Sequence, residues 1–130
     1  MNIVILDASE TSAMKTEELL NDINVSSVDI YTFDNGEDAL EFIEEEGADI
    51  IFSSLELVDM DGVSFTDILL RKSPRIVSKL FITSSSKHSE HFKEVKEVGA
   101  KRFIHKPIDE KYFKHFIIPE VNKILLAKSI

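Results

Sequence analysis

The sequence predicts an α/β fold, in which a parallel five-stranded sheet carries helices on both faces. Five short apolar runs recur along the 130 residues, and segments with helical spacing of apolar residues lie between them. Regular alternation of strands and helices over this length is typical of a doubly wound sheet with right-handed crossovers. We expect a single domain over residues 1–130, because the chain is long enough for one packed core and too short for two.

Each of the five expected strands is too short to form a typical helix. They are NIVILD (2–7), VDIYTF (28–33), DIIFSS (49–54), KLFIT (79–83) and KRFIH (101–105). The apolar stripes of the expected helices are Ala13, Thr16, Leu20 and Ile23; Ala39, Phe42 and Ile43; Phe65, Ile68 and Leu69; Phe92, Val95 and Gly99; and Phe113, Phe116, Ile117, Val121, Ile124 and Leu125. Pro119 interrupts the last stripe and should kink or restart that helix. Turn and cap residues at 34–36, 61–62 and 73–74 mark helix boundaries.

Composition excludes several classes of function. Without cysteine the chain has no disulfides, no thiolate metal site and no thiol redox chemistry. No window approaches the ~18 uncharged apolar residues of a membrane span, and the first residues lack a signal-peptide pattern, so we expect a cytoplasmic protein. The net charge of -9 argues against direct nucleic-acid binding. It is unevenly distributed, with 17 Asp and Glu against one Lys through Gly62, and 7 against 14 basic residues afterwards.

Polar side chains stand at the ends of four expected strands. They are Asp7, Ser54, Ser84 and Lys106. In a parallel α/β sheet, ligands bind beyond the carboxyl ends of the strands, at the point where the strand order reverses. We therefore expect these four side chains to meet in one site at that edge.

Several motifs around these residues resemble the receiver domains of bacterial two-component systems, the CheY-like family. The stretch GADIIFSSLELVDMDG is similar to the family's third strand and loop, and Lys106-Pro107 is similar to its Lys-Pro signature. The resemblance covers essentially the whole chain. It implies a flavodoxin-like (βα)5 three-layer sandwich with strand order 2-1-3-4-5, acting in phosphorelay signal transduction.

The chain departs from the family at two positions. Ser54 falls on the aspartate that accepts the phosphoryl group. The family also has two adjacent acidic residues at the end of the first strand, whereas here Asp7 is followed by Ala8. A neutral hydroxyl cannot form an acyl phosphate, and Asp7 is the only matched ligand for a divalent cation, which prefers several anionic oxygens. The chain is thus expected to be a degenerate member, a pseudo-receiver.

Other positions agree with the family. The resemblance places Ser84 on the Thr/Ser switch position and Phe103 on the aromatic switch position. It places Lys106 where the family's lysine contacts the phosphoryl group, and it implies a cis peptide before Pro107. Because no metal is expected to separate them, we predict a direct ion pair between Asp7 and Lys106.

The predicted function is a phosphorylation-independent protein-interaction module. We expect no enzymatic activity and no cofactor, with weak Mg²⁺ binding at most. The resemblance implies a partner surface on the fourth helix, fifth strand and fifth helix, with Arg102, Phe103 and Tyr112 as its central residues. An acidic protein partner or a second copy of the chain would fit its basic residues. They are Lys87, His88, His91, Lys93, Lys96, Arg102, Lys111, Lys114 and His115.

Two alternatives remain open. The first is a phosphorylatable receiver with a non-standard acid, such as Glu56, whose side chain would lean over the site and compete for Lys106 or replace a carboxylate. If Glu56 has no chemical role, we expect a solvated loop residue. The second is a flavin-binding flavodoxin-like protein, since Ser9, Thr11 and Ser12 follow the first strand, although this loop lacks the glycine of a phosphate cradle.

Overall fold

The structure is a computed structural model, and it describes residues 1–85, 93, 97 and 99–129. Its sheet has five parallel strands in the order β2-β1-β3-β4-β5, as the resemblance implied. The strands are β1 (Asn2–Leu6), β2 (Asp29–Phe33), β3 (Ile50–Ser54), β4 (Leu80–Ser84) and β5 (Arg102–His105). All five expected strands are therefore confirmed to within a residue at each end. The chain passes from β1 outward to β2 and then back across to β3, which creates the reversal in strand order beside β1.

The central strands are buried on both faces, and their side chains alternate between two hydrophobic clusters. In β1, Ile3 and Ile5 join one cluster, whereas Val4 joins the other. Phe52 of β3 stacks on Phe81 of β4, with ring centroids 4.8 Å apart. The polar ends of these strands therefore project from a rigid sheet that is closed on both sides.

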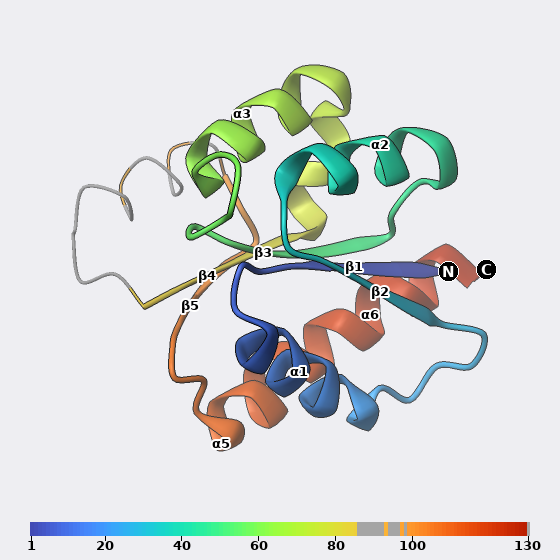
Figure 1. The fold of residues 1–130 in the computed structure, drawn as a ribbon. Helices are drawn as coiled ribbons and strands as arrows, with labels where there is room; N and C mark the ends of the chain where they lie inside the picture. The colour runs from blue at the N-terminus through green and yellow to red at the C-terminus, as the bar shows by residue number, and fades with distance from the viewer. Residues whose placement is uncertain (86–92, 94–96, 98, 130) are drawn as a thin grey trace.

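Helices cover both faces of the sheet and complete a three-layer sandwich (Figure 1). On one face lie α1 (Glu10–Leu19), α5 (Glu110–Tyr112) and α6 (Ile118–Ser129); α2 (Gly36–Glu46) and α3 (Gly62–Lys72) lie on the other. The short helical segments are η1 (Leu20–Asp22), η2 (Pro74–Lys79) and η3 (Phe113–Ile117). The expected fourth helix, with Phe92 and Val95, lies outside the described residues.

Local sequence accounts for where the helices begin. Ser9, Asn35, Asp61 and Asp109 cap the helices that follow them, and each side-chain oxygen accepts the backbone N–H of the third residue onward. This bond satisfies one of the amides that a helix start leaves without an intrahelical acceptor. Since these caps immediately follow strands or their loops, they fix how the chain leaves the carboxyl edge of the sheet.

Pro119 changes the last helix in the way its chemistry requires. Proline has no N–H to bond the carbonyl four residues earlier, and its ring crowds that carbonyl. The segment Phe113–Ile117 is a π-helical turn, in which the N–H of Ile118 bonds Phe113 O, and α6 starts directly afterwards. The expected interruption is confirmed. Among the helices of the described residues, none has the length and apolarity to cross a membrane.

Candidate functional site

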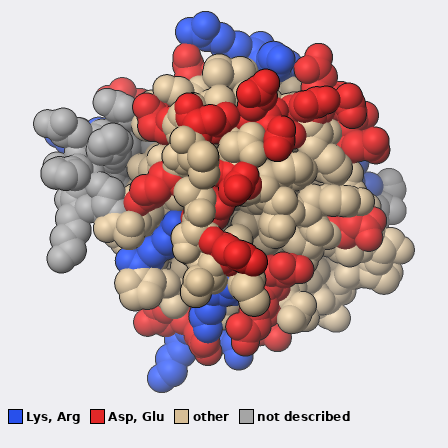
Figure 2. All heavy atoms as spheres, viewed as in Figure 1, with Lys and Arg blue, Asp and Glu red and all other residues tan. Residues whose placement is uncertain are grey.

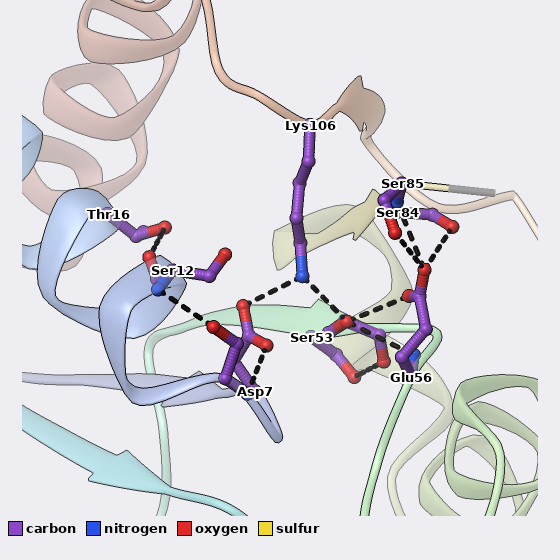
Figure 3. A network of polar contacts seen from close by, with 10 residues as sticks. Asp7, Ser12, Thr16, Ser53, Glu56, Ser84, Ser85 and Lys106 are labelled. Carbon is purple, nitrogen blue, oxygen red and sulfur yellow. Dashed lines mark hydrogen bonds and ion pairs between the residues drawn. The ribbon is translucent and has the colours of Figure 1, made fainter.

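The carboxyl ends of four strands bring the expected polar side chains together (Figure 3). Asp7 follows β1, Ser54 ends β3, Ser84 ends β4, and Lys106 follows β5. Asp7, Ser54 and Ser84 are buried, and Lys106 reaches over the sheet edge with 13% of its side chain exposed. The expected site is therefore assembled, from residues up to 99 positions apart in the sequence.

Asp7 and Lys106 form a direct ion pair, as predicted. Lys106 Nζ lies 2.9 Å from Asp7 Oδ2, and only 4% of the Asp7 side chain is exposed. The other oxygen, Asp7 Oδ1, accepts the backbone N–H of Ser9 at 3.0 Å. The peptide bond between Lys106 and Pro107 is cis, which confirms the second expectation for this loop. Both oxygens of Asp7 thus have donors from the protein itself.

The hydroxyl of Ser54 makes all three hydrogen bonds available to it. Its oxygen accepts Lys106 Nζ at 3.0 Å and the backbone N–H of Glu56 at 3.1 Å. Its proton is donated to Glu56 Oε2 at 3.0 Å. A hydroxyl has one donor and two acceptor lone pairs, so this one is saturated. Ser54 therefore acts as a buried structural link between β3, Lys106 and the loop after β3.

Glu56 lies across the ends of β3 and β4, and the expectation of a solvated loop residue is wrong. Its Oε1 atom accepts three hydrogen bonds: from Ser84 Oγ at 3.0 Å, from the Ser85 N–H at 3.0 Å and from Ser85 Oγ at 2.9 Å. The hydrogen bonds and ion pairs of the described residues include none between Glu56 and Lys106, so competition for Lys106 is also not seen. Figure 3 shows the carboxylate turned toward Ser84 and Ser85.

Hydrogen bonding determines the ionisation of Glu56. Partial burial by itself raises the pKa of this carboxyl, but hydrogen bonds from Ser85, Ser54 and Ser84 together lower it below its ordinary value of 4.5. The carboxylate is therefore charged at neutral pH. It supplies a fixed negative charge beside the buried serines.

Two features of the loop between β3 and α3 hold Glu56 in position. The first is the close fold of the loop onto β3, where a Cβ atom on Gly62 would lie 2.5 Å from both Ser54 O and Leu55 Cα. The second is Asp59, whose carboxylate accepts the N–H groups of Gly36 and Glu37 at 2.7 and 3.0 Å. Sequence reasoning did not single out Asp59. Its contact with the start of α2 is long-range and has no local signal.

The donor set does not fit a divalent cation. Mg²⁺ needs several oxygen ligands, whereas each oxygen of Asp7 already accepts a hydrogen bond from the protein and the side chain of the next residue, Ala8, has no ligand atom. The Glu56 carbonyl oxygen beside this site also accepts a hydrogen bond, from the Ala8 N–H at 3.3 Å. Within the described part of the chain, no three His, Cys, Asp or Glu side chains gather as a metal site would need.

A cavity of about 600 Å³ opens beside the ion pair, between the start of α1 and the loop after β5. Asp7, Lys15, Lys106, Pro107 and Ile108 are among its lining residues. Lys15 makes an ion pair with Glu110 across the rim, which ties α1 to α5. The lining lysines therefore already have acidic partners.

The expected partner surface is only partly described. On its β5 side, Arg102 Nη2 lies 2.5 Å from Glu120 Oε1, and Tyr112 packs on the half-exposed ring of Phe116 with centroids 5.2 Å apart. Phe103 is half-buried against the core and contacts His105. Sequence reasoning missed Glu120 as the partner of Arg102, because the pairing joins a strand to a distant helix.

Of the nine basic residues expected on this surface, the structure describes five. Lys114 Nζ lies 3.8 Å from Asp22 Oδ2 of η1, on the side of α1, so its assignment to the partner surface was wrong. Lys93, Lys111 and His115 are exposed. Lys87, His88, His91 and Lys96 lie outside the described residues. On the face of the molecule that Figure 2 views, acidic side chains lie over the region of α2 and basic groups are scattered.

The family model of the response regulator receiver domain matches residues 3–117, so the chain belongs to the response regulator receiver domain family. It is similar to the transcriptional regulatory protein YpdB of Escherichia coli (strain K12) and of Shigella flexneri, with 26% identity over 110 residues. The match covers 85% of this chain and 43% of the relative. The chain thus spans less than half the length of these curated relatives.

Solved structures show the same fold. A response regulator receiver protein from Pseudoalteromonas atlantica superposes with a TM-score of 0.79 at 19% identity, covering 98% of this chain and 99% of the other. Chemotaxis response regulator CheY4 of Vibrio cholerae superposes with a TM-score of 0.75 at 19% identity, covering 92% and 97%. These likenesses, both at 19% identity, show the receiver fold for this chain.

Proposed function

We propose that this chain is a receiver domain that takes up no phosphoryl group and acts as a protein-interaction module. The observation that carries the proposal is the saturated hydroxyl of Ser54, which stands where the family resemblance puts the accepting aspartate. The proton of Ser54 is directed to Glu56, and its oxygen accepts from Lys106 and from a backbone N–H. No electron pair of this oxygen is left to attack a phosphorus atom without first breaking a buried hydrogen bond.

The charge around Ser54 supports the same proposal. Phosphoryl transfer gathers negative charge on the phosphoryl oxygens, and a metal ion normally offsets it. Here the Asp7 carboxylate is neutralised by Lys106, and the Glu56 carboxylate occupies the space between the ends of β3 and β4. An incoming phosphoryl group would meet an anion instead of a metal ion. We accordingly propose no enzymatic activity and no resident cofactor, with Mg²⁺ bound weakly at most.

The alternative in which Glu56 accepts the phosphoryl group receives less support from the geometry. Its two oxygens accept four hydrogen bonds, which stabilise the charged form and lower its reactivity as a nucleophile. Flavin binding is not proposed, because the chain belongs to the receiver family and the start of α1 lacks a glycine loop.

Titration with Mg²⁺ and beryllofluoride, an analogue of the phosphoryl group, tests the proposal. We expect the ¹H–¹⁵N spectrum of the labelled protein to stay unchanged at concentrations that shift a positive control, the Ala8→Asp/Ser54→Asp double variant. Saturable shifts of the Ser54 and Ser84 amides in the unaltered protein would overturn the proposal. The double variant restores both carboxylates expected from the family and nothing else.

We propose that the partner is a protein and that it binds on the side of β5 and α5. The exposed Phe116 ring next to Tyr112 offers an aromatic anchor, and the Arg102–Glu120 pair offers charges that can exchange partners. Partner capture should fail with an Arg102→Ala/Phe103→Ala variant and persist with Glu45→Gln, an exposed control on α2.

A second copy of the chain is the other candidate. Sedimentation at low and high salt tests it, because pairing of acidic and basic surfaces predicts a larger mass at low salt.

A further inference from the structure

The loop after β3 carries an acidic side chain whose contacts link strand ends of the sheet. Glu56 bonds Ser54 on its own strand end through Oε2 and Ser84 and Ser85 at the end of β4 through Oε1. Three of these donors are hydroxyls and one is a backbone amide. A single carboxylate therefore joins the third and fourth strands beyond the last residue pair of their ladder, Ser54 with Thr83.

The fifth strand is joined to the same point through the main chain. The Lys106 N–H donates to Ser84 O at 2.9 Å, while the Lys106 side chain reaches Ser54 and Asp7. Ser84 is thus held by its hydroxyl from the β3 side and by its carbonyl from the β5 side. Displacement of Ser84 would disturb contacts on both neighbouring strands.

The backbone of Glu56 is held in place by contacts that do not involve its side chain. Its N–H donates to Ser54 Oγ, its carbonyl accepts from the Ala8 N–H, and it pairs with Asp61 in an isolated antiparallel bridge. The close approach of Gly62 to the end of β3 closes this loop tightly. The backbone of Glu56 therefore has little conformational freedom left to lose, and only the side-chain torsions become ordered when the carboxylate binds Ser84 and Ser85.

We infer that Glu56 is a built-in latch, an internal anion that holds Ser84 and Ser85 at the end of β4 in one conformation without any covalent modification. Ser85 directly follows β4, so the latch fixes the position at which this strand ends. This inference deepens the proposed function, since it assigns to the chain itself the control that a bound phosphoryl group would otherwise exert. The contacts that define the latch do not depend on that proposal.

Residue-resolved amide hydrogen exchange tests the latch, with the Ser85 N–H as the reporter. In Glu56→Ala we expect exchange of Ser85 to rise roughly tenfold or more, because a hydrogen bond to a charged acceptor is lost. In Glu56→Gln the rise should be smaller, since the amide keeps one neutral acceptor oxygen. The Leu55 N–H, which donates to Thr83 O within the same sheet region, should stay protected in both variants.

Two controls separate the latch from a general change in stability or charge. Ser85→Ala removes a second donor to Oε1 and should also speed exchange of the residue 85 amide. Glu45→Gln removes one exposed negative charge from α2 and should leave that amide unchanged. Faster exchange at Leu55 as well would show that Glu56→Ala unfolds the chain. In that case the exchange of the Ser85 amide in Glu56→Gln tests the latch.

Unchanged Ser85 exchange in Glu56→Ala, or in Glu56→Gln where the former unfolds, would overturn the latch. An equal rise in Glu45→Gln would do the same. These measurements use no metal and no phosphoryl donor, so their failure is distinct from a failure of the proposed function. The latch is contradicted if Ser85 does not respond, whereas the proposed function is contradicted only if the unaltered protein takes up a phosphoryl group or its analogue.

Discussion

Lys106 Nζ lies 2.9 Å from Asp7 Oδ2, and this ion pair joins the first and fifth strand ends over the buried edge of the sheet. The ammonium group offsets the one carboxylate that the family resemblance would assign to metal binding. Lys106 also bonds Ser54, so the pair belongs to the network that saturates the Ser54 hydroxyl.

Removal of the lysine should destabilise the protein. Lys106→Met leaves the Asp7 carboxylate, with 4% of its side chain exposed, without a counter-charge, and breaking such a pair from one side costs about 3 kcal/mol. The free energy of unfolding in urea measures this loss. Adding Asp7→Asn should restore part of it, since the orphaned charge is then gone.

An exposed ion pair provides the matched control for that experiment. Glu44→Gln breaks the contact of Glu44 with Lys72, in which both side chains are more than half exposed, and should change stability by less than about 1 kcal/mol. Equal effects of Lys106→Met and Glu44→Gln would contradict a structural role for the buried pair.

The contribution of Glu56 to stability should depend on pH. Its pKa in the folded chain lies below the ordinary value of 4.5, so its stabilisation is fully present above the unfolded pKa and is lost as the pH falls through the folded pKa. The difference in unfolding free energy between the unaltered protein and Glu56→Gln should be largest near neutral pH and shrink in acid. Among the described residues, Lys106 and Asp7 are the other charged groups of the Ser54 network, and both remain in the variant.

Urea unfolding at a series of pH values measures the difference, with Glu45→Gln in parallel to account for the general loss of one negative charge. A difference that grows as the pH falls below 4.5 would have the wrong sign for a carboxylate stabilised by hydrogen bonds.

The two glycines that begin α2 and α3 should respond differently to an added methyl group. In Gly62→Ala the new atom would meet backbone, at 2.5 Å from Ser54 O, and crowding of this kind costs about 1–3 kcal/mol. In Gly36→Ala it meets only the end of the flexible Met60 side chain. Thermal unfolding should therefore show the larger loss for Gly62→Ala. A larger loss for Gly36→Ala would contradict the tight closure of the loop onto β3.

Most of the fold could be predicted from the sequence because its signals are local. Short apolar runs identified the strands, and cap residues such as Asn35 and Asp61 identified the helix starts. The meeting of Asp7, Ser54, Ser84 and Lys106 followed from the rule that parallel strand ends share one edge. The ion pair of Asp7 with Lys106 followed from opposite charges brought to that edge.

The contacts of Glu56 could not be predicted in the same way. They depend on the path of the loop after β3, which Gly62 and Asp59 set through backbone contacts that leave no periodic pattern in the sequence. A clue existed in Ser84-Ser85, since two adjacent hydroxyls at a strand end can serve one acceptor. The pairing of Lys114 with Asp22 likewise depends on the rotation of the last helix, which the π-helical turn before Pro119 alters.

Intact-mass measurement after incubation with acetyl phosphate and Mg²⁺ tests the proposal that this receiver domain does not accept a phosphoryl group. The Ala8→Asp/Ser54→Asp double variant serves as the positive control, and aspartyl phosphate is trapped by working quickly at low temperature. We expect an unchanged mass for the unaltered protein under conditions in which the double variant gains one phosphoryl group. A gain of one phosphoryl group by the unaltered protein, located at Ser54 or Glu56, would show that the proposed function is wrong.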